Sequence, residues 1–303
     1  MKAVLSPKAG PPEVLQYTEI DKPHPKANEI LIKVRRATVT IGDVKMRKFS
    51  RLVLAIVGLV FGFKPMKIPG IEYAGDVEAT GDRVTGFSTG DPVCGTTTGL
   101  TFGANAEFVC VPQISRLCVI AIKPESISYA DSAAATVGGM TALQLLKRAK
   151  LQSGESVLIY GASGSVGSFA VQLAKHFGAV VSAVSSTTNL PLVKSIGADH
   201  TIDYTTTDFT QNGQTYDVIF DAVGKTSKSK CEKSLGLSGR FISVKNSTKE
   251  KGDELEYIQN LVVSGDIKVV IDREYSLAQI VEAHRYVESG RKKGNVVIEV
   301  SEK

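Results

Sequence analysis

A run of three glycines constrains the fold of this chain more than any other feature. Gly161, Gly164 and Gly167 stand at spacing three in YGASGSVGSFAVQLAK, directly after the apolar stretch SVLIY and before a segment with helical periodicity. Residues without a Cβ allow backbone N–H groups, and the positive end of a helix dipole, to approach a pyrophosphate closely. The motif is specific only in such a strand–turn–helix context. We therefore predict a dinucleotide-binding loop; the alternative is a purely structural glycine turn.

Strands and helices alternate regularly around this loop. The segment SVGSFAVQLAKHFG has the apolar spacing of a helix, and further helices are expected around LPLVKSIG and near SKCEKSLG. The expected strands are residues 156–160, 179–184, 200–204, 216–223 and 240–244. This order predicts a parallel sheet with right-handed crossovers, which is a Rossmann-like, doubly wound α/β unit.

The segments on either side of this unit have a different character. Residues 1–122 contain short strands and turn-rich stretches such as ATGDRVTGFSTGDPVCG, which are typical of a mostly β, partly open barrel. A helix with Asp131 as its N-cap is expected in SYADSAAATVGGMTALQLLKRA. The end of the chain returns to two helices and a strand. We predict that residues 123–248 form the nucleotide-binding domain and that residues 249–303 rejoin the domain of residues 1–122.

Charge and cysteine content limit the classes of partner. The 303 residues carry a net charge of +5, yet the 36 Lys and Arg are interspersed with 31 Asp and Glu, so no nucleic-acid-binding stripe is expected. The four cysteines show no CxxC spacing, and the N-terminus MKAVLSPKAG lacks the apolar run of a secretory signal. These features predict a cytoplasmic protein with free thiols.

One apolar stretch raises the question of membrane contact. LVLAIVGLVFGF, residues 52–63, has no polar side chain. It is shorter than the ~20 residues that a helix needs to span a bilayer. We expect a buried helix or a lid over an apolar pocket; contact with a membrane surface is the alternative.

The end of the second strand of the predicted unit selects between the two nicotinamide dinucleotides. An Asp or Glu at this place would hold the adenosine ribose of NAD. The chain has SAVSSTTN instead, in which Ser185, Ser186 and Thr187 can donate hydrogen bonds to a 2′-phosphate and no acid repels it. The turn contains no Lys or Arg, so a cation must come from elsewhere. We predict NADP(H) in preference to NAD(H). Tyr204, which closes TIDY, either packs near the adenosine phosphate or is structural.

The order of these segments and several longer motifs resemble a known family. The motifs are PGIEYAGDVEATGDRVTGFSTGDPVCG, GASGSVGSFAVQLAK, LVKSIGADHTIDY and EAHRYVESGRKKGNVV. With them the chain resembles the medium-chain dehydrogenase/reductase superfamily and, within it, the zinc-independent quinone oxidoreductase (zeta-crystallin-like) branch. The resemblance implies a Rossmann-like domain inserted in a GroES-like domain, and an NADPH-dependent reductase of quinones, enones or alkenals.

The same resemblance bears on a metal. In the zinc-dependent alcohol dehydrogenases of this superfamily, the segment that matches PGIEYAG carries a His ligand just before the Glu, where this chain has Ile71. The stretch TVTIGD, which matches the region of a Cys ligand, contains no Cys. Zinc needs three or four converging N, S or O ligands, so we expect no metal. Glu72 is then expected to be structural, bonded to backbone N–H groups or to an Arg.

Individual site residues also follow from the resemblance. Thr40 and Lys45 are implied to approach the nicotinamide half of the cofactor, as the candidate catalytic residues, while Asp43 only fixes a turn. Thr141 matches a nicotinamide-contacting threonine. Val223 and Phe241 end strands at the cofactor edge of the sheet, with a plain core position as the alternative for each. The full set of expected cofactor-binding residues is Thr141, Gly161, Ser163, Gly164, Ser165, Val166, Gly167, Ser185, Ser186, Thr187, Tyr204, Val223, Phe241 and Ser243.

Two departures from the family pattern leave alternatives open. Thr40 and Ile41 stand where relatives have Asn-Pro, and the chain passes from RFISV almost at once into a late helix, without the edge strand through which relatives dimerise. A homodimer is therefore an open question. The first hypothesis is a zinc-free NADP(H)-dependent reductase of a quinone or an α,β-unsaturated carbonyl. The alternatives are a nucleotide-binding module that acts through partners or a membrane with little catalysis and, third, an alcohol dehydrogenase, which Ile71 disfavours.

Overall fold

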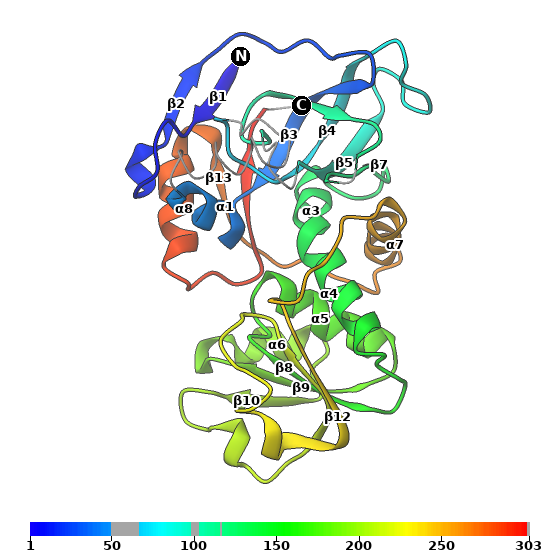
Figure 1. Ribbon diagram of the computed structural model, residues 1–303, viewed down its shortest axis with the longest axis vertical. Coiled ribbons are helices and arrows are strands. Elements are labelled where there is room, and N and C mark those ends of the chain that lie inside the picture. The colour runs from blue at the N-terminus through cyan, green and yellow to red at the C-terminus, as the bar shows by residue number, and fades with distance from the viewer. Residues whose placement is uncertain (50–66, 98–102, 116, 302–303) are drawn as a thin grey trace. The chain divides into compact units, whose positions relative to one another are not determined.

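The computed structural model describes residues 1–49, 67–97, 103–115 and 117–301, so the stretch 52–63 lies outside the described residues. The chain divides into two compact units (Figure 1). Unit 1 comprises Met1–Val137, Glu250–Val263 and Ile271–Lys303, and unit 2 comprises Gly138–Lys249 and Ser264–Val270. No helix of the described residues is long and apolar enough to cross a membrane.

Unit 1 is built on a seven-stranded sheet in the order β13-β14-β3-β4-β5-β7, with β6 paired to β3. All pairings are antiparallel except the parallel pair β13 and β14. A separate antiparallel pair is formed by β1 and β2. The strands of unit 1 are β1 (Lys2–Leu5), β2 (Gln16–Glu19), β3 (Glu29–Thr38), β4 (Glu72–Thr80), β5 (Pro92–Thr96), β6 (Phe108–Pro112), β7 (Ile120–Ile122), β13 (Ile271–Ser276) and β14 (Asn295–Glu299).

Four helices belong to unit 1. They are α1 (Ile41–Lys48), α3 (Tyr129–Ala134), α7 (Gly252–Val263) and α8 (Ile280–Glu288). Helices α3 and α8 pack directly on strands of this sheet. The core beneath them consists of Val, Ile and Ala side chains from β3, β4 and β14 together with the inner face of α8. Alternate residues of β3, such as Ile30, Ile32 and Val34, are fully buried in it, as the period of a strand requires.

The bounds of the nucleotide-binding domain and the N-cap of the helix near its expected start both differ from the expectations. Residues 123–137 pack with unit 1, because α3 lies against β3 and β4, and residues 264–270 pack with unit 2. The helix is capped by Ser128 rather than Asp131, since the Ser128 hydroxyl accepts the Asp131 N–H at 3.0 Å. Asp131 sits inside the first turn, where a carboxylate suits the helix dipole.

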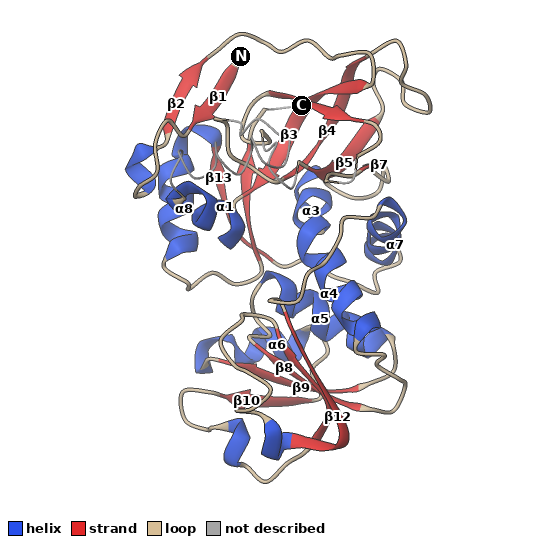
Figure 2. Cartoon of the chain, viewed as in Figure 1, coloured by secondary structure: helices blue, strands red, loops and turns tan. Residues whose placement is uncertain are grey.

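Unit 2 contains one parallel five-stranded sheet, which Figure 2 shows in red. Its strand order is β10-β9-β8-β11-β12. Strands β9 and β10 are added on one side of β8 and strands β11 and β12 on the other, so the strand order reverses between β8 and β11. This confirms the predicted parallel α/β sheet. Ligands of such sheets bind at the carboxyl ends of the strands, at the point of reversal. The strands are β8 (Ser156–Tyr160), β9 (Val180–Ser185), β10 (His200–Asp203), β11 (Tyr216–Asp221) and β12 (Leu235–Ser243).

The helices of unit 2 are α4 (Thr136–Arg148, whose first two residues belong to unit 1), α5 (Ser165–His176) and α6 (Leu190–Ser195). The prediction of a helix near SKCEKSLG is wrong. Only a 3₁₀ turn, Glu232–Ser234, forms there, because the chain enters β12 at Leu235 and pairs with β11. Two glycines in LGLSG also disfavour a helix at this point. Within the described residues no strand lies between β12 and α7, so the edge strand through which relatives dimerise has no counterpart there.

Candidate functional site

The loop between β8 and α5 has glycines where no other residue fits. Gly161 has a φ of +81°, and a Cβ on it would lie 2.5 Å from Cγ1 of Val223. A Cβ on Gly167 would lie 2.2 Å from the carbonyl oxygen of Gly161. The first glycine therefore makes the turn, and the last lets α5 pack onto the strand end.

Gly164 has a different role, because the space beside it is open. It is the N-cap of α5 in an extended conformation, and a Cβ there would meet only the Gly161 carbonyl oxygen, at 3.5 Å. No side chain caps the helix at this residue. The first turn of a helix carries N–H groups that lack intrahelical acceptors, and it lies at the positive end of the dipole. The residues present therefore fit the pyrophosphate of a dinucleotide.

The hydroxyl groups predicted to receive a 2′-phosphate lie together at the end of β9, but each of them bonds to another side chain of the protein. The Ser185 hydroxyl donates to the hydroxyl oxygen of Ser163 at 2.9 Å, and the Asn189 amide donates to the same oxygen at 3.1 Å. Ser186 lies 3.4 Å from the hydroxyl of Thr188. Ser185 is almost completely buried. Much of the donor capacity of this turn is used inside the protein.

An acid that sequence reasoning missed also reaches this turn. The Thr187 hydroxyl donates to Oδ2 of Asp203 at 2.5 Å, and the other carboxylate oxygen accepts the backbone N–H and the hydroxyl of Thr205 at 2.9 and 2.7 Å. The hydrogen bond from Thr187 lowers the pKa of this exposed carboxyl. The premise that no acid faces the turn is therefore wrong. Strand β10 pairs in parallel with β9 and places Asp203 opposite Ser185. The acid at the end of the neighbouring predicted strand, in TIDY, was therefore the sequence feature that could have revealed this contact.

Tyr204 follows Asp203 at the same edge. Its backbone N–H donates to the Ser185 carbonyl at 3.1 Å, and its side chain is 54% exposed. The ring is thus available on the surface beside the turn. Its contact with an adenosine phosphate stays a prediction.

The loop after β11 is shaped by Asp221, a fully buried acid that the sequence did not single out. Its carboxylate accepts four backbone N–H groups, those of residues 223 to 226, at 3.1, 2.8, 3.4 and 3.2 Å. The hydroxyl of Ser243 donates to it at 3.3 Å. Val223 is 42% exposed, so it is no core residue, whereas Phe241 packs against the core of unit 2. Thr141 is half-buried in α4.

In unit 1, Glu72 is fully buried at the start of β4 and has three donors. Oε1 accepts the Val137 N–H at 2.8 Å and lies 3.0 Å from the Thr136 hydroxyl, while the Thr38 hydroxyl donates to Oε2. One expected type of partner, a backbone N–H, is therefore present, and hydroxyls take the place of an Arg. Burial raises the pKa of Glu72 to about 7 despite these bonds. Lys292 nearby has a pKa lowered to about 8 by burial, an effect that the charge of Glu72 opposes.

Thr40 and Asp43 form a capping box at the start of α1. The Asp43 carboxylate accepts the backbone N–H and the hydroxyl of Thr40 at 2.8 and 2.6 Å, and Thr40 accepts the Asp43 N–H at 3.2 Å. Asp43 is buried, and desolvation raises its pKa to about 6. It therefore fixes the turn, as the resemblance implies. Lys45 is exposed on α1, and the roles of Thr40 and Lys45 stay predictions.

The residues around Glu72 do not fit a zinc ion. Position 71 is an isoleucine, and the side chains of Thr38 and Thr136 already bond to the carboxylate. Within the described ranges, three or more His, Cys, Asp or Glu side chains do not gather anywhere in a geometry suited to a metal. Zinc sites of proteins need at least three such ligands.

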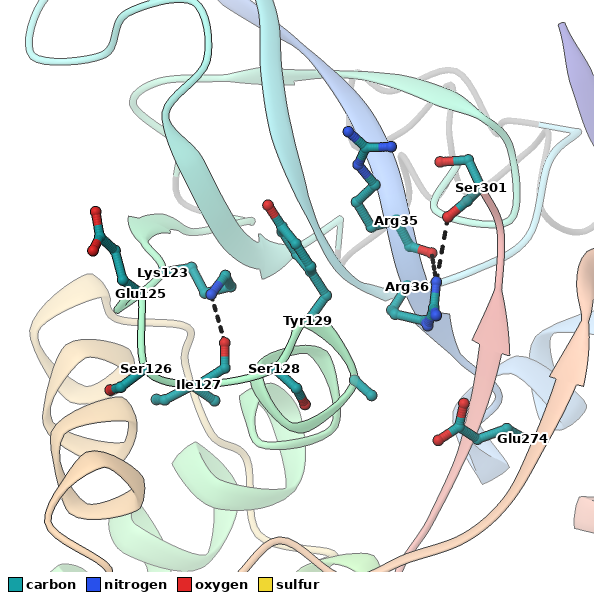
Figure 3. Close-up of a pocket in the computed structure, with 11 residues that line it drawn as sticks. Arg35, Arg36, Lys123, Glu125, Ser126, Ile127, Ser128, Tyr129, Glu274 and Ser301 are labelled. Carbon is teal, nitrogen blue, oxygen red and sulfur yellow. Dashed lines mark hydrogen bonds between the residues drawn. The ribbon is translucent and has the colours of Figure 1, made fainter. Parts of the chain in front are cut away.

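Unit 1 also has an open hollow of about 510 Å³, lined by both basic and acidic side chains (Figure 3). Arg36 donates to the carbonyls of Arg35 and Ser301 at 3.0 and 3.3 Å, and Lys123 donates to the Ile127 carbonyl at 2.5 Å. Arg36 and Lys123 thus already donate hydrogen bonds to backbone carbonyls of the protein. The hollow does not offer the unused charge that an anionic cofactor would need.

Comparisons with known proteins agree with this geometry. The sequence profile described as alcohol dehydrogenase GroES-like domain matches residues 26–123, and the profile described as zinc-binding dehydrogenase matches residues 165–288. The chain is 35% identical to 2-methylene-furan-3-one reductase of Solanum lycopersicum, over 98% of this chain and 79% of that protein. It is 31% identical to the chloroplastic NADPH-dependent alkenal/one oxidoreductase of Arabidopsis thaliana, over 98% of this chain and 79% of the relative. The solved quinone oxidoreductase of Coxiella burnetii has a TM-score of 0.85 and 28% identity and covers 99% of both chains.

Proposed function

The chain belongs to the medium-chain dehydrogenase/reductase superfamily as an oxidoreductase, and from that premise we propose that it transfers a hydride from NADPH to a quinone or an α,β-unsaturated carbonyl without a zinc ion. The observation that carries the proposal is the glycine loop, in which the space beside Gly164, the N-cap of α5, is open. Relatives named as reductases of furanones, alkenals and quinones support the acceptor class.

The chain's own part in the reaction is positioning. A bound reduced nicotinamide supplies a hydride. The start of α5 binds the pyrophosphate, and the strand ends of the parallel sheet orient the two nucleoside halves. Thr40 and Lys45 approach the nicotinamide half, and the capping box with Asp43 holds the Thr40 hydroxyl in place. Charge in a quinone or enone spreads over the acceptor during reduction, so a proton from water or from a hydroxyl is sufficient and no Lewis acid is required.

The absence of zinc is part of the proposal. Ile71 replaces a ligand, and the nearby acid Glu72 already has three hydrogen-bond donors. Without a metal, an alkoxide would lack its usual stabilisation, so a simple alcohol is a poor substrate. Metal analysis that finds stoichiometric zinc in the purified protein would contradict this part.

A panel assay tests the acceptor class. The oxidation of NADPH is followed with quinones, enones and alkenals, and simple alcohols with NADP⁺ serve as the negative control. We expect turnover with at least one of the first three classes and none with the alcohols. Thr40→Val is expected to lower kcat more than Thr40→Ser, which keeps the hydroxyl. Tight binding of NADPH with no turnover of any acceptor would contradict the proposal and favour a binding module.

A further inference from the structure

The turn that should hold the 2′-phosphate of NADPH has few donors left. The Thr187 proton is bonded to Asp203, and the Ser185 proton and the Asn189 amide are both directed to Ser163. The turn itself contains no Lys or Arg. A phosphate dianion in a protein needs a cation or several donors. If NADP(H) is the cofactor, a residue outside this turn must supply the charge.

The loop after β11 presents a lysine in a fixed backbone frame. Asp221 accepts the Lys225 N–H at 3.4 Å and the Gly224 N–H at 2.8 Å, and Gly224 has a φ of +70°. The backbone is thus held by a buried carboxylate while the Lys225 side chain is exposed. Within the part of the chain that the structure describes, no group bonds to its ammonium.

This loop borders the glycine turn. Strand β11 pairs with β8, with Asp221 opposite Tyr160, and the Ala222 N–H donates to the Tyr160 carbonyl at 2.9 Å. Val223 then packs onto Gly161 so closely that a Cβ on the glycine would lie 2.5 Å from Cγ1 of the valine. Val223 thus contacts the glycine turn, and Lys225 lies two residues after it in the chain. Both residues follow β11, which is next to β8, at the point where the strand order reverses.

We propose that Lys225 supplies the cation that binds the 2′-phosphate of NADPH. The inference rests on the proposed use of NADP(H). The pyrophosphate already has the start of α5, whereas the 2′-phosphate has no other charge partner at the β9 turn, so the lysine charge is assigned to the latter. Lys245 is another cation near this loop; its Cε would lie 3.2 Å from a Cβ on Gly224. Lys245 follows β12, the strand at the edge of the sheet, so its variant is the second one compared with Lys225.

Direct binding measurements test the lysine without reference to turnover. The dissociation constants of NADPH and NADH are measured by calorimetry for the wild type and for Lys225→Gln, Lys225→Arg, Lys228→Gln and Lys245→Gln. We expect Lys225→Gln to weaken NADPH roughly tenfold, because one charge-assisted hydrogen bond is lost, and to leave NADH within about twofold. Lys225→Arg should keep most of the affinity. Lys228→Gln is the matched control, since Lys228 is exposed in the same segment but lies beyond the residues held by Asp221.

The fragments 2′,5′-ADP and 5′-AMP sharpen the result. Lys225→Gln should weaken 2′,5′-ADP alone, and added salt should affect 2′,5′-ADP less in the variant than in the wild type. Equal weakening of NADPH and NADH would overturn the assignment to the 2′-phosphate, and so would an unchanged NADPH affinity or a loss found only in Lys245→Gln. A wild-type protein that binds NADH as tightly as NADPH would overturn the proposed cofactor preference itself. Retained wild-type preference with no effect of Lys225→Gln would overturn only the role of the lysine. Because the side chain is exposed, unchanged thermal unfolding of the variant serves as the check on folding.

Discussion

The start of β4 and the loop between β8 and α5 are both bounded by glycines, and the steric reason is the same. Gly70 has a φ of +104°, and a Cβ on Gly75 would lie 2.1 Å from the Lys33 carbonyl oxygen. Gly161 and Gly167 are restricted in the same way. The two regions differ in what the glycines leave room for. At β4 the chain places its own carboxylate, Glu72, among three donors, whereas at the β8–α5 loop the space beside the helix start is left open.

This difference separates a structural site from a binding site. The donors around Glu72 are satisfied inside unit 1, so the segment contributes to stability. No side chain caps the start of α5 at Gly164, and in the proposed function its N–H groups bind the pyrophosphate. Substitutions at β4 should therefore change the free energy of unfolding, and substitutions at the loop should change cofactor affinity.

Removal of the Glu72 carboxylate should give the largest effect. Glu72→Ala leaves the Val137 N–H and the Thr38 hydroxyl buried without their acceptor, which should lower the free energy of unfolding by ~3 kcal/mol or more. Glu72→Gln, which keeps one acceptor, should cost less. Urea unfolding measures both. The turnover number per folded molecule should stay near that of the wild type, and a large loss of turnover with unchanged unfolding would contradict a structural role.

The roles of the second and third glycines of the loop can be separated by a matched pair of alanine substitutions. Gly167→Ala brings a Cβ to 2.2 Å from the Gly161 carbonyl oxygen, so it should cost ~2 kcal/mol of stability and also weaken NADPH. Gly164→Ala meets only one atom, at 3.5 Å, so stability should change by less than ~1 kcal/mol while NADPH affinity falls severalfold. Thermal unfolding and calorimetric titration give the two quantities. Equal loss of stability in both variants would show that Gly164 is also structural.

The glycine loop was predictable because its constraints are local. A turn with positive φ, an open helix start and a close helix contact occupy seven residues, and the turn and the close contact each demand a residue without a Cβ. The parallel sheet followed equally directly, since the apolar strands β8 and β9 are separated by a segment with the apolar spacing of a helix, which is α5. The sequence periodicity and the fold therefore agree for the core of unit 2.

The partners of the acids were not predictable, because they come from distant residues. Glu72 bonds to side chains and backbone that lie 34, 64 and 65 positions away along the chain. Its neighbour Ile71 shows only that a zinc-ligating His is missing, and does not indicate the partners of Glu72. Asp203 reaches Thr187 from the adjacent strand, 16 positions along the chain. Such pairs depend on strand order and register. The helix expected near SKCEKSLG failed for the same reason, since pairing with β11 prevailed over local propensity.

The pH dependence of stability should show the Glu72 site as well. The folded protein raises the pKa of Glu72 to about 7 by burial, against a usual value near 4.5, so the folded state binds this proton more tightly than the unfolded state. The unfolded state therefore loses the proton first as the pH rises. The Glu72 contribution to the free energy of unfolding should then decrease between about pH 5 and about pH 7, by ~1–2 kcal/mol.

The comparison with Glu72→Gln isolates this effect from two others. Burial raises the pKa of Asp43 to about 6, which acts in the same direction. Burial lowers the pKa of His284 to about 3, so its contribution acts in the opposite direction and stability from it is lost as the pH falls below the usual histidine value. Both groups remain in the variant. The difference between wild type and variant, measured by urea unfolding at several pH values, should decline with pH, and a difference that is independent of pH would contradict the raised pKa.

The smallest expected effect concerns Asp203, which lies beside the β9 turn. It is neither part of the buried structural site around Glu72 nor part of the glycine loop. Its exposed carboxylate has a lowered pKa, owing first to the Thr187 hydrogen bond, and is thus ionised at neutral pH beside the proposed 2′-phosphate site. Asp203→Asn keeps an acceptor for Thr187 and removes the charge. NADPH should bind about two- to threefold more tightly at low salt, with less gain at high salt, and NADH should be unchanged. Asp208→Asn is the control, because Asp208 makes a similar exposed turn contact with the Thr210 N–H at 2.9 Å. If Asp203→Asn strengthens NADH as much as NADPH, the carboxylate acts on the dinucleotide as a whole and the β9 turn does not face the 2′-phosphate.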